Sequence, residues 1–313
     1  MFAYAIRRII FTIPMLFFVF TVIFFIMRVA GGDPTYSILG EHANKEAVVQ
    51  LRLKLGLDEP ISTQYFTALK KLVKGDLGNS LINDRPIAPQ IMKVLPYTME
   101  LTVAAIIIGL LIGIPSGVAA ALQRNKMADY LLRVFSLAGL SMPSFYLGIL
   151  LLLAFAVQLD LFPIIGFTRS GSFLDRLHYL FLPALSLGLN KAAFVSRVTR
   201  SNMLERLGSD YVRTARAKGL SEYKVIFKHT LKDCMIPIVT VSGVYVGVLL
   251  GGAILTETIF NRPGLGKFLV EAISQRDYNA IQSGLVFYGI LIVLVNLAVD
   301  IIYGFIDPRV KYE

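Results

Sequence analysis

Long apolar runs alternate with shorter polar segments along the chain. A transmembrane helix needs about 20 predominantly apolar residues to cross the hydrocarbon core of a bilayer. Five runs meet this requirement without an internal charge, over residues 9–27, 101–122, 134–159, 234–256 and 278–299. A sixth run, 179–196, is interrupted by Lys191. The pattern therefore predicts five or six membrane-spanning helices.

The positions of the basic residues decide between five and six. Lys and Arg collect in the short cytoplasmic loops of membrane proteins. Segment 197–233 holds nine Lys or Arg against four Asp or Glu, and both chain ends and the loop after the second run are also basic. Six spans place these four segments on one side of the membrane. We therefore predict an all-α polytopic membrane protein with six transmembrane helices and cytoplasmic termini.

The composition agrees with this class. The chain has 313 residues, of which 55% are hydrophobic and 17% charged, and its mean hydropathy is +0.65. Soluble domains are about 25% charged, so a soluble enzyme and a disordered chain are disfavoured. The single cysteine, Cys234, excludes an internal disulfide and a cysteine-cluster metal site. The three histidines are too scattered to indicate a zinc centre.

The predicted organisation has three parts. Residues 1–97 form the first transmembrane helix and a long extracytoplasmic loop, in which 31–34 and 75–78 are typical of turns between short helices. Residues 98–306 form a five-helix transmembrane core with a cytoplasmic loop at 200–236, and 307–313 form a cytoplasmic tail. The first apolar run is too long for a secretory signal core, so we expect it to be retained.

Two predicted helices carry a glycine at every fourth position. These glycines are Gly109, Gly113 and Gly117 in the second span, and Gly243, Gly247 and Gly251 in the fifth. Small residues at this spacing let helix backbones approach closely in lipid. The stripes predict helix packing, either within this chain or against a second membrane subunit.

Polar residues mark two places inside the predicted spans. Ser141, Ser144 and Tyr146, with Pro143 among them, give the third span a polar side that is expected either to line a pathway or to pack against a helix. Lys191 is a candidate for the same pathway because a charge deep in a membrane is often functional. We favour the simpler interpretation, in which Lys191 reaches the surface or a water-filled cavity. Asp300 is its candidate acidic partner.

The loop between the fourth and fifth spans predicts an organised element. Ser209 or Asp210 can begin a short helix and Gly219 can end it in a left-handed conformation. The helical period places four residues on one mostly small face, and these are Tyr211, Thr214, Ala215 and Lys218. Such a face fits a groove on another protein. The alternative is a basic loop lying on anionic lipid headgroups.

Several motifs together resemble one family, the inner-membrane permease subunits of binding-protein-dependent ABC importers for peptides and nickel, in particular the B-type dipeptide and oligopeptide permeases. The strongest match is the segment 210–221, followed by 229–237. Shorter matches lie at 32–34, 55–58, 182–188, 262–266, 276–278 and 307–309. This chain departs from the family's general Glu-Ala-Ala signature. It has Arg213, Thr214 and Ala215 before Gly219, so the glutamate of the signature is missing. This departure is typical of the peptide branch.

The resemblance implies a fold, partners and a location. The fold would be that of a type I ABC importer permease in a bacterial or archaeal cytoplasmic membrane. The partners would be a homologous second permease, two cytoplasmic ATPases and an extracytoplasmic substrate-binding protein, besides the lipid bilayer. ATP and Mg would be bound by the ATPases, and this chain would hold no cofactor or metal. The loop would be the coupling helix that docks on the ATPase, through Tyr211, Arg213, Thr214, Ala215, Lys218 and Gly219.

Other functions have less support in the sequence. The segment 262–267 superficially resembles a phosphate-binding loop, but Asn261 and Phe268 occupy positions that require Gly and Ser or Thr. A stand-alone secondary transporter would need inverted repeats and embedded ion-coupling residues. Intramembrane catalysis and nucleic-acid binding find no motif. Peptides are the expected cargo, while nickel, glutathione and oligosaccharides remain open.

Overall fold

The computed structural model describes residues 2–29, 34–39, 44–164 and 172–306. The described residues form helices and short connections, and the chain divides into two compact units. Unit 1 comprises residues 1–8, 99–262 and 295–313, and unit 2 comprises 9–98 and 263–294. The matches predicted at 32–34 and 307–309, and the tail at 307–313, lie mostly or wholly outside the described residues.

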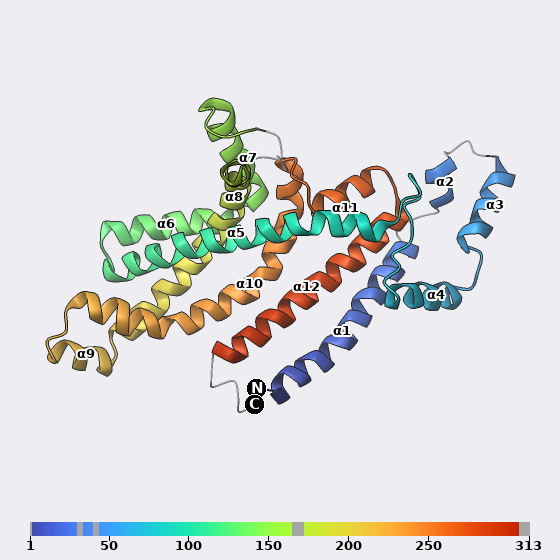
Figure 1. Cartoon of the computed structure of the whole chain (residues 1–313). Coiled ribbons are helices and arrows are strands. Elements are labelled where there is room, and N and C mark those ends of the chain that lie inside the picture. The colour runs from blue at the N-terminus through green and yellow to red at the C-terminus, as the bar shows by residue number, and fades with distance from the viewer. Residues whose placement is uncertain (1, 30–33, 40–43, 165–171, 307–313) are drawn as a thin grey trace. The chain divides into compact units, whose positions relative to one another are not determined.

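Figure 1 shows the helices of both units, coloured in chain order from blue to red. Three helices contribute to both units, and these are α1 (Phe2–Val29), α5 (Ile87–Leu122) and α12 (Tyr278–Ile306). Unit 1 also contains α6 (Met127–Ser141), α7 (Ser144–Leu151), the π-helical segment η1 (Leu152–Gln158), α8 (Phe173–Leu207), α9 (Asp210–Ala217), the π-helical segment η2 (Lys224–Leu231) and α10 (Lys232–Ile259). Unit 2 also contains α2 (Pro34–Leu39), α3 (Lys45–Leu55), α4 (Ile61–Val73) and α11 (Leu265–Ser274).

Five helical stretches are long and apolar enough to cross a membrane, and these are Ile6–Val29, Ile87–Leu122, Phe173–Leu207, Lys224–Ile259 and Tyr278–Ile301. They include the doubtful run around Lys191, which forms part of the 35-residue helix α8. The total is six if the bent pair Met127–Ser141 and Ser144–Gln158 counts as one span. The prediction of six apolar spans is confirmed with that pair counted as one.

The third predicted span is not one continuous helix. α6 and the α7–η1 segment meet at an angle of 107°, whereas the sequence predicted a single helix over 134–159. Pro143 has no backbone N–H and disfavours helical backbone in the preceding residue. Met142 accordingly adopts an extended conformation, with φ −93° and ψ 130°. The proline therefore breaks the span rather than merely kinking it.

Asn190 of α8 supports this break. A helix end leaves backbone carbonyls without partners, and buried carbonyls need a donor. The Asn190 side-chain amide donates to the carbonyls of Gly139 (2.9 Å) and Met142 (3.1 Å). Its oxygen accepts a hydrogen bond from the Tyr245 hydroxyl at 2.7 Å. One amide of α8 thus links the end of α6 to α10.

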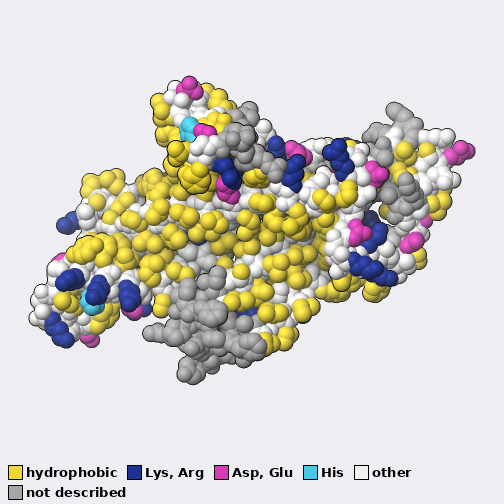
Figure 2. All heavy atoms as spheres, in the orientation of Figure 1, with side chains coloured by type: hydrophobic (Ala, Val, Ile, Leu, Met, Phe, Trp, Pro, Cys, Tyr) yellow, Lys and Arg dark blue, Asp and Glu magenta, His cyan; other side chains and the backbone are white. Residues whose placement is uncertain are grey.

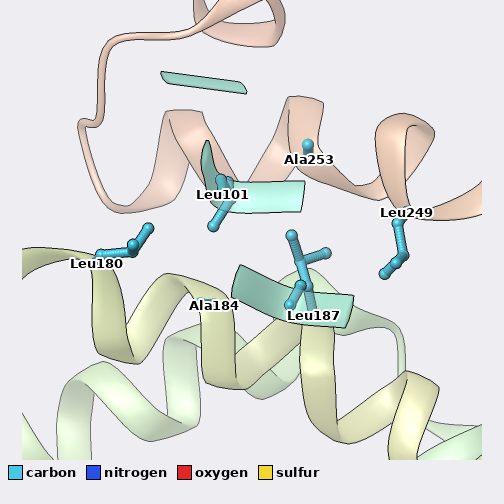
Figure 3. Packing of buried hydrophobic residues seen from close by; sticks show 7 residues of the cluster. Leu101, Leu180, Ala184, Leu187, Leu249 and Ala253 are labelled. Atoms are coloured by element: carbon cyan, nitrogen blue, oxygen red, sulfur yellow. The ribbon is translucent and has the colours of Figure 1, made fainter. Parts of the chain in front are cut away.

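The core of unit 1 lies where α5, α8 and α10 meet. Figure 3 labels Leu101, Leu180, Ala184, Leu187, Leu249 and Ala253 of this cluster, which also contains Ala105. A second cluster at the other end of the same helices includes Val118, Val195, Met203, Cys234 and Ile238. Burial of apolar side chains along both clusters holds the three helices together.

The first glycine stripe packs within the chain. A Cβ added at Gly109 would lie 2.8 Å from Cγ of Lys191, and one at Gly113 would lie 2.7 Å from Cβ of Val195. A Cβ at Gly117 would lie 2.6 Å from the carbonyl oxygen of Ser196. The stripe therefore brings α5 against α8, so the alternative in which this stripe meets a second subunit is wrong for these residues.

The three glycines of the second stripe differ in their surroundings. A Cβ at Gly243 would clash with Cγ1 of Val299, so Gly243 allows α10 to approach the part of α12 in unit 1. Gly251 is exposed, and a Cβ there would meet no described atom within 4 Å. Gly247 is half-buried. Only Gly243 of this stripe therefore has a defined packing role within the described residues.

Unit 2 is organised around Tyr65 of α4. Tyr65 packs with Phe20, Phe24 and Val286 in a buried cluster, and its hydroxyl lies 2.8 Å from that of Thr21. The aromatic rings of Phe20 and Phe24 lie 5.4 and 5.2 Å from the Tyr65 ring, in a range where tilted and edge-to-face pairs are favourable. Tyr65 thus joins α4 to α1 and α12.

A second contact in unit 2 lies directly after the segment predicted to be a turn. Gly75 and Gly78 adopt left-handed conformations, with φ values of 76° and 75°, which confirms that turn. Asp277 is buried and accepts hydrogen bonds from the Ser80 hydroxyl (2.5 Å) and the Leu81 N–H (3.1 Å). It also accepts from the Ala280 N–H at 3.1 Å, so the same carboxylate caps the start of α12.

The glycine contact between α5 and α8 gives a direct test of the packing. We expect Gly117→Ala to destabilise the protein by about 1–3 kcal/mol, because the new methyl group meets a backbone carbonyl that cannot rotate away. Thermal unfolding in mild detergent measures this loss. Gly251→Ala is the matched control, since it adds the same methyl group to open space. Equal melting temperatures for the two variants would contradict the described packing.

Candidate functional site

The loop between α8 and α10, which the charge distribution predicts to be cytoplasmic, is an ordered part of unit 1. α9 spans Asp210–Ala217, and Gly219 after it has φ 75°, which confirms the predicted left-handed helix end. Ser209 precedes α9 but does not cap it through its side chain, because its hydroxyl donates to the Arg206 carbonyl at 2.6 Å. Helical structure resumes at Glu222 and continues through η2 into α10.

The structure changes which face of α9 is free. Val212 and Ala215 are buried against Val225, with Leu220 packed beside them. Ala215 was predicted to lie on the docking face, and this is wrong, because the small side chain lets η2 pack against α9. The remaining predicted docking residues, Tyr211, Arg213, Thr214, Lys218 and Gly219, are exposed.

One hydrogen bond and one ion pair attach α9 to neighbouring segments. Arg206 near the end of α8 pairs with Asp233 at the start of α10, and the Tyr211 hydroxyl donates to the same carboxylate at 3.3 Å. Arg216 forms two hydrogen bonds with Glu222, at 2.8 and 3.2 Å. The Arg216 guanidinium lowers the pKa of the Glu222 carboxyl from its ordinary value, which keeps this exposed pair charged.

The loop presents a basic and aromatic surface. Figure 2 shows Lys and Arg side chains gathered at the end of unit 1 that carries α9. The Arg213 side chain is 74% exposed, so it extends away from the packed face. Tyr223 is exposed, and its ring packs at a tilt of 40° against that of Phe227, with the ring centroids 4.8 Å apart. The buried residues of α9 therefore pack against η2, while the basic and aromatic side chains of this surface are exposed.

Lys191 has a different place from the predicted one. Its side chain is fully buried and its Nζ donates to the carbonyl of Ser242 at 3.0 Å. The Tyr245 ring lies 5.8 Å from Nζ. The expectation that Lys191 reaches the surface or a water-filled cavity is therefore wrong, and in this conformation it does not line an open pathway.

Asp300 is not the partner of Lys191. Its carboxylate pairs with Arg8 at 2.8 Å, and both side chains are partly exposed. The predicted pair therefore fails because each residue lies beside a different group, a backbone carbonyl for Lys191 and an arginine for Asp300.

The other candidate pathway residues lie at the break between α6 and α7. Ser141 and Tyr146 are exposed and Ser144 is half-buried. The Ser141 hydroxyl donates to the Leu137 carbonyl at 2.9 Å. Their role as a pathway lining stays a prediction.

An ion pair that the sequence analysis did not single out lies between α6 and α8. Asp129 is fully buried, and Arg200 donates to both of its oxygens at 2.7 Å. The Asn125 N–H also donates to Asp129, at 3.0 Å. In the sequence, Asp129 is only an acidic residue in the first turn of a helix, next to a basic loop. This signal does not identify Arg200 as its partner.

The described residues contain no group of three or more His, Cys, Asp or Glu side chains that could hold a metal ion. The features that stand out are instead a set of apolar spanning helices and one organised cytoplasmic loop between α8 and α10. Together they define a class, a polytopic membrane protein with an organised loop between α8 and α10.

Comparison with known families identifies the chain more closely. Residues 113–312 match the family of binding-protein-dependent transport system inner membrane components, and residues 1–102 match the N-terminal part of such membrane components. The chain belongs to this family. It is a permease subunit of an ABC importer in the inner membrane, and the importer also contains ATPase subunits and works with a substrate-binding protein.

Relatives match the chain along its whole length. It is 42% identical to the dipeptide transport system permease protein DppB of Alkalihalophilus pseudofirmus, with complete coverage of both chains. It is 40% identical to the di/tripeptide permease protein DppB of Pseudomonas aeruginosa, again with complete coverage. The glutathione transport system permease protein GsiC of Escherichia coli is 38% identical, with 99% of each chain covered.

Solved structures show the same fold. An inward-facing conformation of the MetNI methionine ABC transporter gives a TM-score of 0.58 at 19% identity, covering 70% of this chain and 96% of that chain. An amino acid ABC transporter with histidines gives 0.53 at 14% identity, covering 71% and 94%. The predicted importer permease fold is thereby confirmed.

The position of Lys191 predicts the effect of removing its charge. We expect Lys191→Met to fold and to transport substrate like the original protein, because Met preserves the apolar stem beside Gly109 and removes a costly buried charge. Its melting temperature in detergent should be unchanged or higher. Lys191→Glu is the contrasting variant, since a carboxylate would face the Ser242 carbonyl and lower the yield. Loss of uptake in a correctly folded Lys191→Met protein would show that the charge itself is needed.

Proposed function

We propose that this chain forms half of a translocation pathway for short peptides. A homologous second permease supplies the other half, two ATPase subunits drive the cycle from the cytoplasm, and the substrate-binding protein delivers the peptide on the outer side. This assignment rests on one observation, the full-length similarity to permeases named for dipeptides and for di- and tripeptides.

Glutathione is the second candidate substrate, and it is favoured by the similarity to the glutathione permease. Glutathione is itself a tripeptide with a γ-linked glutamate, so both candidates share charged termini and peptide amides. The pathway would therefore pass a small, flexible, zwitterionic molecule in either case.

The loop supports a coupling role for α9. Its exposed residues, Arg213, Thr214 and Lys218, would contact the ATPase, while Val212 and Ala215 hold it against η2. Since η2 continues into α10, and Arg206 of α8 pairs with Asp233 of α10, a displacement of α9 would move the ends of both helices. ATP binding can shift the permease between two states only if the contact differs between them.

Charge reversal on the exposed face tests the docking role. We expect the double variant Arg213→Glu/Lys218→Glu to abolish ATP-driven uptake and to reduce co-purification of the ATPase, with a normal melting temperature, because neither side chain is packed. Ala215→Glu serves as a contrast, since it buries a carboxylate and should lower stability as well. Normal uptake and ATPase recovery in the double variant would overturn the assignment of α9.

The substrate assignment needs a separate test. We expect a strain lacking this chain to lose uptake of radiolabelled dipeptides, and the plasmid-borne chain to restore it. Glutathione and nickel uptake are measured in the same strains. Restoration of glutathione or nickel uptake alone would replace the peptide assignment. Uptake by the purified chain in vesicles without ATP would instead indicate a secondary transporter.

A further inference from the structure

A groove of about 440 Å³ lies between the end of α5, α6 and α8 in unit 1. Its apolar wall includes Ala120, Leu132, Leu137 and Leu140. Three arginines also line it, and these are Arg133 of α6 and Arg197 and Arg200 of α8. Ser136 and Ser196 also line the groove, and both of these hydroxyl-bearing residues are buried. A groove with an apolar wall and basic groups favours a ligand that has both an apolar part and a negative charge.

The charge of the groove is not balanced by the described residues. Arg200 is committed to Asp129, on which both of its hydrogen bonds end at 2.7 Å. Asp129 also lies in the field of Arg133, whose guanidinium stacks over the Tyr130 ring at 5.8 Å. Arg197 has no ion-pair partner among the residues that the structure describes. Three guanidinium groups against one carboxylate leave two positive charges at the groove.

The position of the groove points to the source of the anion. It adjoins the loop at 123–126, which carries Arg124 and Lys126 and which the charge distribution places on the cytoplasmic side. The neighbouring outer side of α6 exposes large apolar residues, including Leu131, Val134 and Phe135. Figure 2 shows hydrophobic side chains gathered over α6. A basic groove next to a lipid-facing helix at this level matches the headgroup region of the inner leaflet.

We propose that the groove binds one anionic phospholipid from the cytoplasmic leaflet. Arg133 and Arg197 hold the phosphate, Ser136 and Ser196 offer hydroxyl donors, and an acyl chain lies along the leucines of α6. Arg200 contributes charge while its bond with Asp129 keeps α6 and α8 in place. The bound lipid would join α6 to α8 beside the end of α5 that carries Ala120.

The experiment measures lipid retention by the complete transporter. The complex is purified in mild detergent, exchanged into nanodiscs containing phosphatidylglycerol and phosphatidylcholine in equal amounts, and examined by native mass spectrometry after release. We expect selective retention of phosphatidylglycerol. The variant Arg133→Gln/Arg197→Gln should weaken this retention roughly 25-fold, from about fivefold for each arginine near an anionic headgroup. Arg133→Lys/Arg197→Lys should keep most of it.

The matched control is Arg124→Gln/Lys126→Gln, which removes the same two charges from the same side but outside the groove. It should retain phosphatidylglycerol normally, and all variants should have similar melting temperatures. Glycerol phosphate is added as a competitor without acyl chains, and it should not displace the lipid at equal concentration.

Three results would overturn the proposal. The first is equal lipid retention in the groove and control variants, which would indicate general surface charge. The second is displacement by glycerol phosphate at equal concentration, which would indicate an anion site without a lipid. The third is efficient disulfide cross-linking of Ser136→Cys to a cysteine on the second permease, which would show that a protein covers the groove.

Discussion

The close approach of α5 and α8 is the contact on which the rest of unit 1 depends. In lipid, helices associate through close packing because the surrounding chains are as apolar as the helix surfaces. Gly109, Gly113 and Gly117 allow this approach by leaving space for Lys191, Val195 and the backbone at Ser196. The contact fixes the rotation of α8. It therefore also fixes where the polar residues of α8 point.

Three polar residues of α8 then have separate structural tasks. Asn190 satisfies carbonyls at the end of α6, Lys191 donates to a carbonyl of α10, and Arg200 holds the buried Asp129 of α6. A buried polar group is costly unless it is hydrogen-bonded. Each of these bonds thus favours one arrangement of helices over others of similar apolar burial, and α8 connects α5, α6 and α10.

The loop between α8 and α10 also combines buried packing contacts with exposed residues that we propose to be functional. Its buried residues are small or branched and fasten α9 to η2, while its charged residues are exposed. A loop that is rigid within itself can transmit a displacement to α8 and α10 rather than absorb it. This division between a packed face and a free face explains why the docking residues and the residues that support them must be tested with different substitutions.

The sequence by itself predicted the apolar spans, the short helix in the loop and the family, since apolar length and local motifs depend on neighbouring residues. It located Lys191 and Ala215 but misjudged their surroundings. Only the tertiary structure decided that Ala215 faces η2, that the third span breaks by 107°, and that Lys191 meets Ser242, 51 positions away. The physical reason is that a buried polar or small side chain takes its partner from whichever helix packs against it, and that packing depends on the shape of the whole helix surface.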